Sequence, residues 1–513
     1  MKSRFRLPPI PLFHLEPLER RRILNAGFLD PTIVPGGAAT LNLGVDLKHL
    51  EFDGQPAIIQ PDGKIVVLAE DWGSHADCSP NIDGDIGDLA ILFSRFNADG
   101  SRDSSFGTNG VATVPCMVDY AYNPILQPDG KLLVIGPYDG IIRITANGQR
   151  DTTFQSQGVE YSGMFWDSNL DWMALARDGK FIIGGEALYP GSNYTFTVVG
   201  INPDGSIDTS YGSGGSVNES FVDDFAYASS LLVQSDGKLL AFGWNRRNAD
   251  LGRNDYPNSL LRFNPDGTPD PAFGQGGRVL LPGPDRWGQN HQQPDGKIIQ
   301  ILFSYERPLD SNGITLLRLN ENGDPDSTFG DNGQVNLTWP WSRTVYYSSF
   351  DTLVQPDGKI IVWETSGGFE RLNSDGSLDT TFGFNGFISL RPTTPGHQLA
   401  VSGVFLRDGH LLITAEEFYR DPARDPALLV DPDSADWRAV RLISLTTDAT
   451  QPWQLISNDS SISVAPPVVG AATALSPNPR TAPDALPKVD DVASLFDTPD
   501  PLDRQDDDSD IWE

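Results

Sequence analysis

A short hairpin motif recurs seven times in this chain of 513 residues, and it limits the fold more than any other feature. The motif is Asp-Gly-Lys, or Asp-Gly-His in its last copy, and each copy lies between apolar runs, as in AIIQPDGKIVVLAE. Four copies carry the full string Gln-Pro-Asp-Gly-Lys, in which Pro presets φ, Asp accepts backbone hydrogen bonds and Gly adopts a left-handed conformation. The motif therefore predicts seven β-hairpins, with glycines at Gly63, Gly130, Gly179, Gly237, Gly296, Gly358 and Gly409.

A second motif alternates with the first, as in NADGSRDSSFG and NPDGTPDPAFG. A degenerate further copy, FLDPTIVPGG with Asp30, precedes the first hairpin. We interpret the second acidic residue as a structural cap that accepts turn amides, and the Phe as a wedge between repeats. The six clear copies place that acidic residue at Asp103, Asp151, Asp208, Asp270, Asp326 and Asp379.

Four short strands fit into each repeat. One follows the Phe-Gly pair, one enters the Asp-Gly turn, one leaves it, and one precedes the next Asn-x-Asp-Gly. The strand that leaves the turn is nearly all apolar and is predicted to be central, whereas the next strand contains Arg and is predicted to lie further out. The sequence thus predicts an all-β fold, a seven-bladed β-propeller of four-stranded blades.

The first and last strands of the repeat region are predicted to share one blade. The region begins with a Phe-Gly-type element and the strand AATLNL, and its last repeat ends with the strand RAVRLISL. We expect the propeller to be closed by pairing of these N- and C-terminal strands, because such pairing removes two exposed sheet edges.

The two motifs in fixed order resemble the delta-60 repeat of bacterial proteins over roughly residues 28 to 447. The resemblance implies β-propeller blades in secreted or surface proteins and no particular enzyme activity. LEPLERRRILNA, residues 15–26, resembles the L-E-P-R-x-L-L export motif, although Leu18 interrupts the Pro-Arg pair and Ile23 replaces a Leu. The expected organisation is a leader at 1–26, a propeller at 27–447 and a disordered, acidic, Pro-rich tail at 448–513. The leader has an alternative interpretation as an arm without a sorting role.

Charge excludes some partners. The chain holds 69 acidic and 37 basic residues, a formal charge of −32, which repels nucleic-acid phosphates and anionic lipid. We find no apolar run long enough to span a bilayer, so no membrane insertion is expected. The prediction is a monomer that is extracellular or on the cell surface.

The connections opposite the repeated turns vary greatly in length, and variable loops on a rigid scaffold are common binding sites. Exposed aromatic rings beside polar groups suit a carbohydrate or protein ligand, although each ring alone has the alternative role of capping a blade core. Two of the candidates are assigned to loops after the strand that leaves the turn, namely Trp72 and Trp244. The others are assigned to connections between repeats, namely Trp166, Trp172, Trp287, Trp339 and Trp341.

The sequence also offers candidate metal and disulfide sites. Asp83, Asp85 and Asp88 crowd one loop and make calcium a candidate cofactor, although the loop lacks the spacing of an EF-hand. Cys78 and Cys116 form one disulfide or remain two thiols.

No catalytic residue is predicted. The six histidines lack metal-ligand spacing, and neither a nucleophile elbow nor a phosphate-binding loop is found. The leading hypothesis is a non-catalytic exported or cell-surface protein that binds a ligand on the loop-rich face. The alternative is a polysaccharide-active hydrolase or lyase using central-channel carboxylates. A third interpretation is a structural or adhesive spacer with no ligand.

Overall fold

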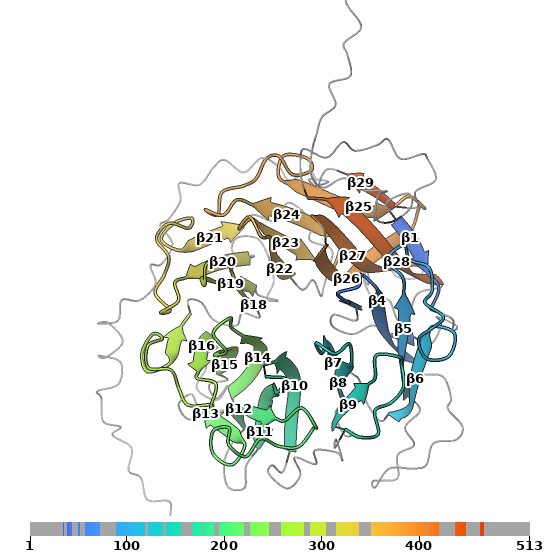
Figure 1. Cartoon of the computed structure of the whole chain (residues 1–513). Helices are drawn as coiled ribbons and strands as arrows, with labels where there is room; N and C mark the ends of the chain where they lie inside the picture. The colour runs from blue at the N-terminus through green and yellow to red at the C-terminus, as the bar shows by residue number, and fades with distance from the viewer. Residues whose placement is uncertain are drawn as a thin grey trace, which may run out of the picture. The chain divides into compact units, whose positions relative to one another are not determined.

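The computed structural model describes residues 34, 38–43, 50–51, 57–71, 89–117, 122–136, 140–154, 167–176, 178–188, 194–219, 226–245, 258–281, 288–303, 314–337, 350–407, 409–419, 437–447 and 462–465. Throughout these residues every regular element is a β-strand. The strands form seven antiparallel sheets arranged around a central opening (Figure 1). The predicted all-β, seven-bladed propeller is confirmed.

The first three blades follow the order of the chain. Blade 1 contains β2 (Leu50–Glu51), β3 (Ala57–Ile59), β4 (Ile65–Asp71), β5 (Leu89–Phe96) and β6 (Val111–Met117). Blade 2 contains β7 (Tyr122–Leu126), β8 (Leu132–Gly136) and β9 (Gly140–Ile144). Blade 3 contains β10 (Asp167–Leu175), β11 (Phe181–Leu188), β12 (Tyr194–Ile201) and β13 (Ser216–Glu219).

The remaining blades complete the ring. Blade 4 contains β14 (Ala226–Val233), β15 (Leu239–Asn245), β16 (Asn258–Phe263) and β17 (Arg278–Leu280). Blade 5 contains β18 (Asn290–Gln292), β19 (Ile298–Phe303), β20 (Ile314–Leu319) and β21 (Gln334–Leu337). Blade 6 contains β22 (Phe350–Val354), β23 (Ile360–Glu364), β24 (Gly368–Leu372), β25 (Phe387–Pro392) and β29 (Ile462–Ala465). Blade 7 contains β26 (His397–Arg407), β27 (His410–Tyr419), β28 (Trp437–Thr446) and β1 (Ala38–Leu41).

Strand order within a blade explains the repeat. In blades 3, 4 and 5 the inner strand enters the Asp-Gly turn, the second strand leaves it, the third precedes Asn-x-Asp-Gly and the outer strand follows Phe-Gly, or Tyr-Gly in blade 3. The third strand therefore lies further out than the second, as predicted. Its Arg does not mark exposure, however, because every residue of β16, β20 and β24 is buried.

Blade 7 joins distant parts of the chain. Strand β1 pairs antiparallel with β28, with Ala38 opposite Ile443 and Leu41 opposite Val440. Arg441 of β28 donates to the Thr40 hydroxyl of β1 and is paired with Glu417 of β27. The sheet thus combines one strand from residues 38–41 with three strands from residues 397–446.

Blade 6 gains a strand that the sequence did not indicate. Strand β29 pairs antiparallel with β25, with Ala465 opposite Ser389 and Ile462 opposite Pro392. The strand falls within the segment 448–513, for which no regular structure was predicted. It covers the outer edge of β25, an edge that would otherwise present unpaired backbone groups.

Seven apolar clusters hold neighbouring blades together, one at each seam. At the seam between blades 4 and 5, for example, Phe242 and Leu260 pack with Ile298 and Leu317. Each such side chain contributes roughly 1.5–3 kcal/mol when it is fully buried. The core is therefore a ring of inter-blade layers.

The predicted Phe wedge is confirmed at these seams. Phe329 of blade 5 is fully buried and lies against Gly376 in the Asn-x-Asp-Gly turn of blade 6. A Cβ atom added to Gly376 would lie 3.0 Å from the Phe329 ring, and the glycine has a φ of 85°. Both the close approach and the left-handed backbone therefore require glycine there.

Candidate functional site

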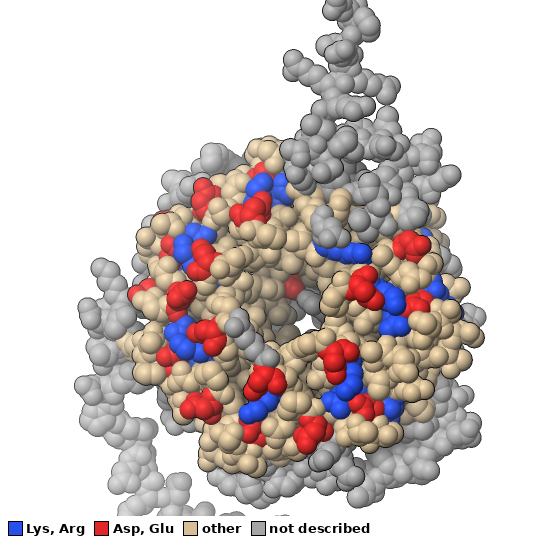
Figure 2. Space-filling view, viewed as in Figure 1, with Lys and Arg blue, Asp and Glu red and all other residues tan. Residues whose placement is uncertain are grey.

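One face of the propeller carries both sequence motifs and is called the turn face here. The inner strand runs to this face and turns at Asp-Gly, and the third strand returns to it and ends at Asn-x-Asp-Gly. Figure 2 shows basic and acidic side chains next to one another in clusters around the central opening. The turn face is therefore polar around a channel.

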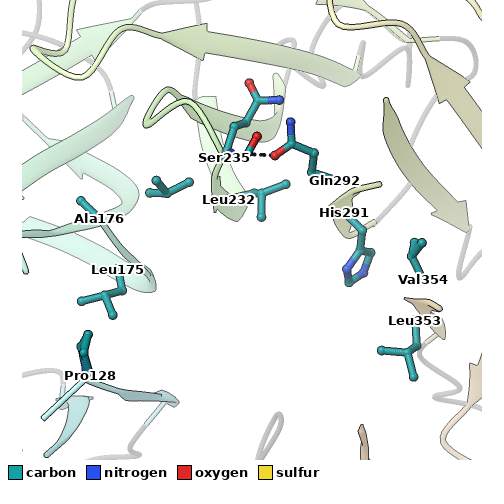
Figure 3. Close-up of a pocket in the computed structure, with 11 residues that line it drawn as sticks. Pro128, Leu175, Ala176, Leu232, Ser235, His291, Gln292, Leu353 and Val354 are labelled. Carbon is teal, nitrogen blue, oxygen red and sulfur yellow. Dashed lines mark hydrogen bonds between the residues drawn. The ribbon is translucent and has the colours of Figure 1, made fainter. Parts of the chain in front are cut away.

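A hollow lies where the inner strands reach the turn face, and we call it the channel mouth. Its volume is about 700 Å³. Its walls come from blades 2 to 6 and are mostly aliphatic, as Figure 3 shows. The lining residues are Pro128, Leu175, Ala176, Leu232, Val233, Gln234, Ser235, His291, Gln292, Leu353 and Val354. No Trp, Tyr or Phe belongs to this described lining.

Blade 5 interrupts the aliphatic wall. Blades 4 and 6 present Leu232 and Leu353 there, whereas blade 5 presents His291. The imidazole Nε2 of His291 lies 3.0 Å from Oδ1 of Asp351, which is buried in β22 of the next blade. Because an ionised carboxylate only accepts, the ring donates through Nε2, and in the tautomer that carries its proton on Nε2 the other nitrogen, Nδ1, is an acceptor.

Two glutamines add amide groups to the channel mouth. Oε1 of Gln292 accepts a 2.7 Å hydrogen bond from the backbone amide of Ser235, which ties blade 5 to blade 4. Gln234 is 3% exposed, and its buried Oε1 has no hydrogen-bond partner among the described residues. Oε1 of the matching glutamine is also buried without a partner among the described residues in Gln127, Gln293 and Gln355, so this is a feature of the repeat, and the acceptor specific to the channel mouth is Nδ1 of His291.

The sequence contained a signal for this site that was not used. The apolar run before the hairpin turn is broken in NHQQPDGK, where other repeats have strings such as AIIQPDGK. A polar substitution in one of several otherwise equivalent repeats indicates a local role, because blade construction alone does not require it.

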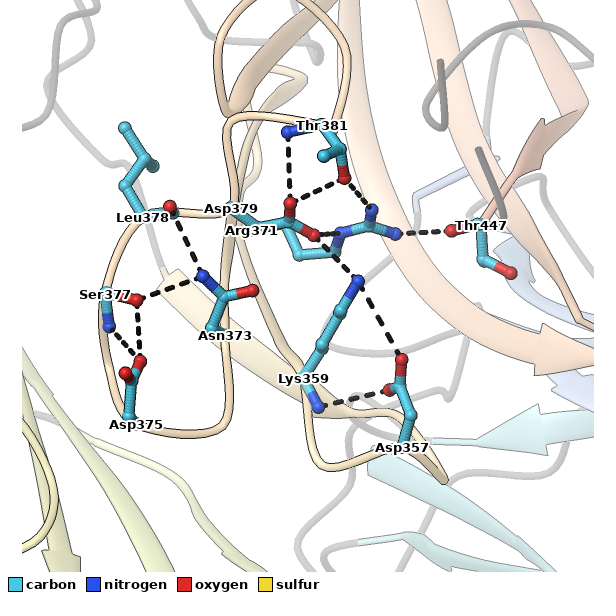
Figure 4. A network of polar contacts seen from close by, with 10 residues as sticks. All are labelled: Asp357, Lys359, Arg371, Asn373, Asp375, Ser377, Leu378, Asp379, Thr381 and Thr447. Atoms are coloured by element: carbon cyan, nitrogen blue, oxygen red, sulfur yellow. Dashed lines mark hydrogen bonds and ion pairs between the residues drawn. The ribbon is translucent and has the colours of Figure 1, made fainter. Parts of the chain in front are cut away.

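A second polar system surrounds the channel mouth. Figure 4 shows it in blade 6, where Asp379 accepts hydrogen bonds from the amide and hydroxyl of Thr381, at 3.0 and 2.6 Å. The other carboxylate oxygen of Asp379 lies 2.8 Å from Nε of Arg371 and 3.0 Å from Nζ of Lys359. The predicted capping role of this Asp is confirmed, and the Arg and Lys are additions that the sequence analysis missed.

The same triad of Arg, Asp and Lys occurs in four other blades. Each Arg stands eight residues before its Asp, a constant interval that could have identified the pair. The four are Arg95–Asp103–Lys64, Arg143–Asp151–Lys131, Arg262–Asp270–Lys238 and Arg318–Asp326–Lys297.

Each triad keeps its carboxylate ionised. Burial alone raises the pKa of Asp379, but hydrogen bonds from Thr381 and Lys359 and the charge of Arg371 outweigh it and lower the pKa to about 2. The pKa of Asp326 is held well below its ordinary value against the same effect of burial, by Lys297, Thr328 and Arg318. Such carboxylates are unsuited to donate a proton near neutral pH.

Each triad also connects two blades. The guanidinium of Arg371 lies 4.6 Å from the centre of the Phe382 ring and donates to the carbonyl of Thr447 in blade 7, at 2.5 Å. The corresponding carbonyls in the other four blades also belong to the following blade, at Ala146, Pro203, Glu321 and Ser374. The repeated charges therefore serve blade assembly.

Blade 3 departs from this pattern in two places at once. Gly200 stands where the five blades with a triad have Arg, and Tyr211 stands where they have Phe. A Cβ atom at Gly200 would lie 2.7 Å from the Tyr211 side chain, so the ring position leaves no room for an Arg. Asp208 keeps only the lysine, with Lys180 Nζ at 2.8 Å.

The structure places two of the predicted tryptophans within strands. Trp172 lies in β10 and is half-buried, and Trp244 lies in β15, so neither falls in a connection as the sequence analysis assigned them. Trp172 pairs with Gly184 in β11. The other five, Trp72, Trp166, Trp287, Trp339 and Trp341, lie outside the described residues. The proposed aromatic ligand site is therefore not tested.

The remaining predicted sites also fall largely outside the described part of the chain. This applies to Asp83, Asp85 and Asp88 and to Cys78, whereas Cys116 lies in β6. Among the residues that the structure describes, no three His, Cys, Asp or Glu side chains are grouped as metal ligands. The described part also contains no helix with the length and apolarity of a membrane span.

Comparison with known proteins agrees with the repeat pattern. A family model described as a domain of unknown function (DUF5122) beta-propeller matches residues 127–154, 176–211, 234–273 and 355–382. Together with the seven blades, this match defines the chain as a β-propeller repeat protein. No curated protein matches the sequence.

Several solved structures are similar at low identity. Polysaccharide lyase Uly1 is 11% identical with a TM-score of 0.42, covering 83% of this chain and 98% of the lyase. BamB from Moraxella catarrhalis is 11% identical with a TM-score of 0.34, covering 79% and 99%. A protein of unknown function from Bacteroides caccae is 13% identical with a TM-score of 0.33, covering 67% and 96%.

Proposed function

We propose that the protein is a non-catalytic binding scaffold, exported or held at the cell surface, whose ligand is a carbohydrate or a protein. The channel mouth carries this proposal, because it is a concave, mainly aliphatic hollow with a few fixed polar groups, the usual composition of a ligand site. The charged triads around it are used to join blades. The sequence also favours the loop-rich face as a ligand surface.

The alternative proposal, a polysaccharide-active enzyme, is favoured by one observation. Asp351 is a carboxylate near the channel wall and pairs with His291, an arrangement that can support proton transfer. The paired groups lie beside aliphatic side chains, however, and the described lining offers no aromatic platform for a sugar ring.

Glycan and protein binding measured together with turnover separates the two. For a scaffold we expect binding to immobilised glycans or to protein partners and no release of reducing ends from the bound polysaccharide. Release of reducing ends that is lost in Asp351→Asn would overturn the scaffold proposal in favour of the enzyme. Localisation is tested separately, by looking for the full-length chain in the culture medium or as a protease-accessible surface protein.

A further inference from the structure

The channel mouth offers a particular combination of groups to a ligand. Its walls are aliphatic on both sides of His291, with Leu232 on one side and Leu353 on the other (Figure 3). Its volume of about 700 Å³ lies within the range of small-ligand pockets. An apolar side chain entering this space would bury its surface against the aliphatic lining, which favours binding.

His291 provides an acceptor at this site. Nδ1 of His291 is left as an acceptor because Asp351 fixes the other ring nitrogen as a donor. Gln234 lines the same hollow, but its Oε1 is buried in the same way as Oε1 of Gln127, Gln293 and Gln355 in other repeats and is not part of the ligand site. A ligand that brings an N–H donor to Nδ1 of His291 gains affinity there.

The surrounding charge favours a cationic ligand. The motifs of blades 4 and 6, which border the hollow, each contain three Asp residues against one Lys and one Arg. The Asp side chains of the hairpin turns are largely exposed, with 53% for Asp236 and 57% for Asp357. The chain as a whole carries a formal charge of −32. Complementary charge would also speed the encounter with a basic partner.

From these observations we infer that the channel mouth binds a basic, extended segment of another protein, which inserts one aliphatic side chain between Leu232 and Leu353 and donates hydrogen bonds to His291. This inference rests on the proposed function and specifies its ligand. It favours a protein over a carbohydrate because the described lining is aliphatic and lacks a Trp, Tyr or Phe platform.

Fluorescence anisotropy with a defined probe tests the inference on the full chain. The probe is a labelled peptide, Lys-Arg-Gly-Ser-Leu-Ser-Gly-Arg-Lys, and it is compared with the same peptide carrying Ala for Leu and with one carrying Glu for each Lys and Arg. We expect saturable binding of the first peptide, about tenfold weaker binding of the Ala peptide and no measurable binding of the acidic peptide.

Two matched variants locate the binding. In His291→Leu, blade 5 has a leucine where the neighbouring blades have Leu232 and Leu353. The change removes one hydrogen-bond acceptor and should weaken peptide binding about tenfold. Val233→Ala should also weaken binding, whereas Ile59→Ala, at the same place in the repeat but outside the lining, should not.

Three results would overturn the inference: equal binding of the Leu and Ala peptides, unchanged binding in His291→Leu, or dimerisation of the chain that is lost in Val233→Ala. The last result would make a second copy the occupant. If glycans or other proteins bind while the peptides and mouth variants show no effect, the inference fails and the scaffold proposal stands. Turnover of polysaccharide would remove the scaffold proposal itself.

Discussion

Glu370 offers a sharp test of how the blades pack. It lies in β24 opposite Val362, on the face that packs in the seam between blades 5 and 6. It is 5% exposed, and its Oε2 has no hydrogen-bond partner among the described residues. The equivalent place before the Arg holds Leu261 in blade 4 and Leu317 in blade 5. Glu370 is therefore an ionisable group at a position built for an apolar side chain.

Burial raises the pKa of Glu370 to about 8 from an ordinary value of 4.5. The folded state therefore binds a proton more tightly than the unfolded state between these values. The resulting stability is fully present below pH 4.5 and is lost as the pH rises through 8. With 1.36 kcal/mol per pKa unit, the loss between about pH 5 and about pH 9 amounts to roughly 4 kcal/mol.

Urea unfolding followed by tryptophan fluorescence at several pH values measures this loss. In Glu370→Gln and Glu370→Leu the dependence on pH over this range should be smaller than in the wild type by roughly 4 kcal/mol. Glu321→Gln, which alters an exposed side chain, is the control and should follow the wild type. Parallel curves for the wild type and both Glu370 variants would refute the reasoning, because they would show that Glu370 does not titrate in the folded blade.

Three further outcomes follow from the turn face and are measured by chemical or thermal unfolding. Asp326→Asn should cost about 3–5 kcal/mol because it leaves Arg318 buried without its counter-charge, whereas Asp295→Asn on an exposed turn should cost under about 1 kcal/mol. The pKa of Asp326 is lowered, so its stabilisation is present above the ordinary pKa of 3.8 and is lost on acidification; Asp326→Asn should reduce that acid sensitivity. Gly274→Ala should destabilise more than Gly276→Ala, because both have left-handed backbones but only the first Cβ would strike a backbone carbonyl, at 2.0 Å. Equal losses in either matched pair would contradict these explanations.

The repeated part of the fold was predictable because its causes are local. The Gln-Pro-Asp-Gly-Lys string closes its own turn, and in blade 6 the amide of Gln355 donates to the carbonyl of Lys359 at 2.8 Å. The Asp-x-x-Phe cap is equally local, since Asp379 binds the amide two residues later. Seven copies of two local motifs were therefore sufficient to predict seven blades.

Features that depend on neighbouring blades were not predictable in this way. The third strand lies further out than the second, as its Arg indicated, but the burial of that Arg was not predictable: Arg371 is 1% exposed because Asp379, Phe382 and a carbonyl of the next blade surround it. Strand β29 depends on pairing with β25, far away in the sequence. The channel mouth depends on five inner strands meeting, so His291 in a single repeat gave only a weak signal.

The five triad links between blades point in one direction along the chain, and this has a consequence for biosynthesis. Each Arg of a triad donates a hydrogen bond to a carbonyl that lies 51 to 76 residues later in the chain. The guanidinium of a newly synthesised blade therefore gains this hydrogen bond only after the next blade has been made. At the seam between blades 7 and 1 the hydrogen bond runs in the opposite direction, because Arg407 donates to the carbonyl of Gly63, 344 residues earlier. Strand β1 leaves the ribosome first among the described strands, and its partner β28 follows about 400 residues later. Blades can thus form in order during translation, but β1 must remain without its partner until nearly the whole propeller has been synthesised.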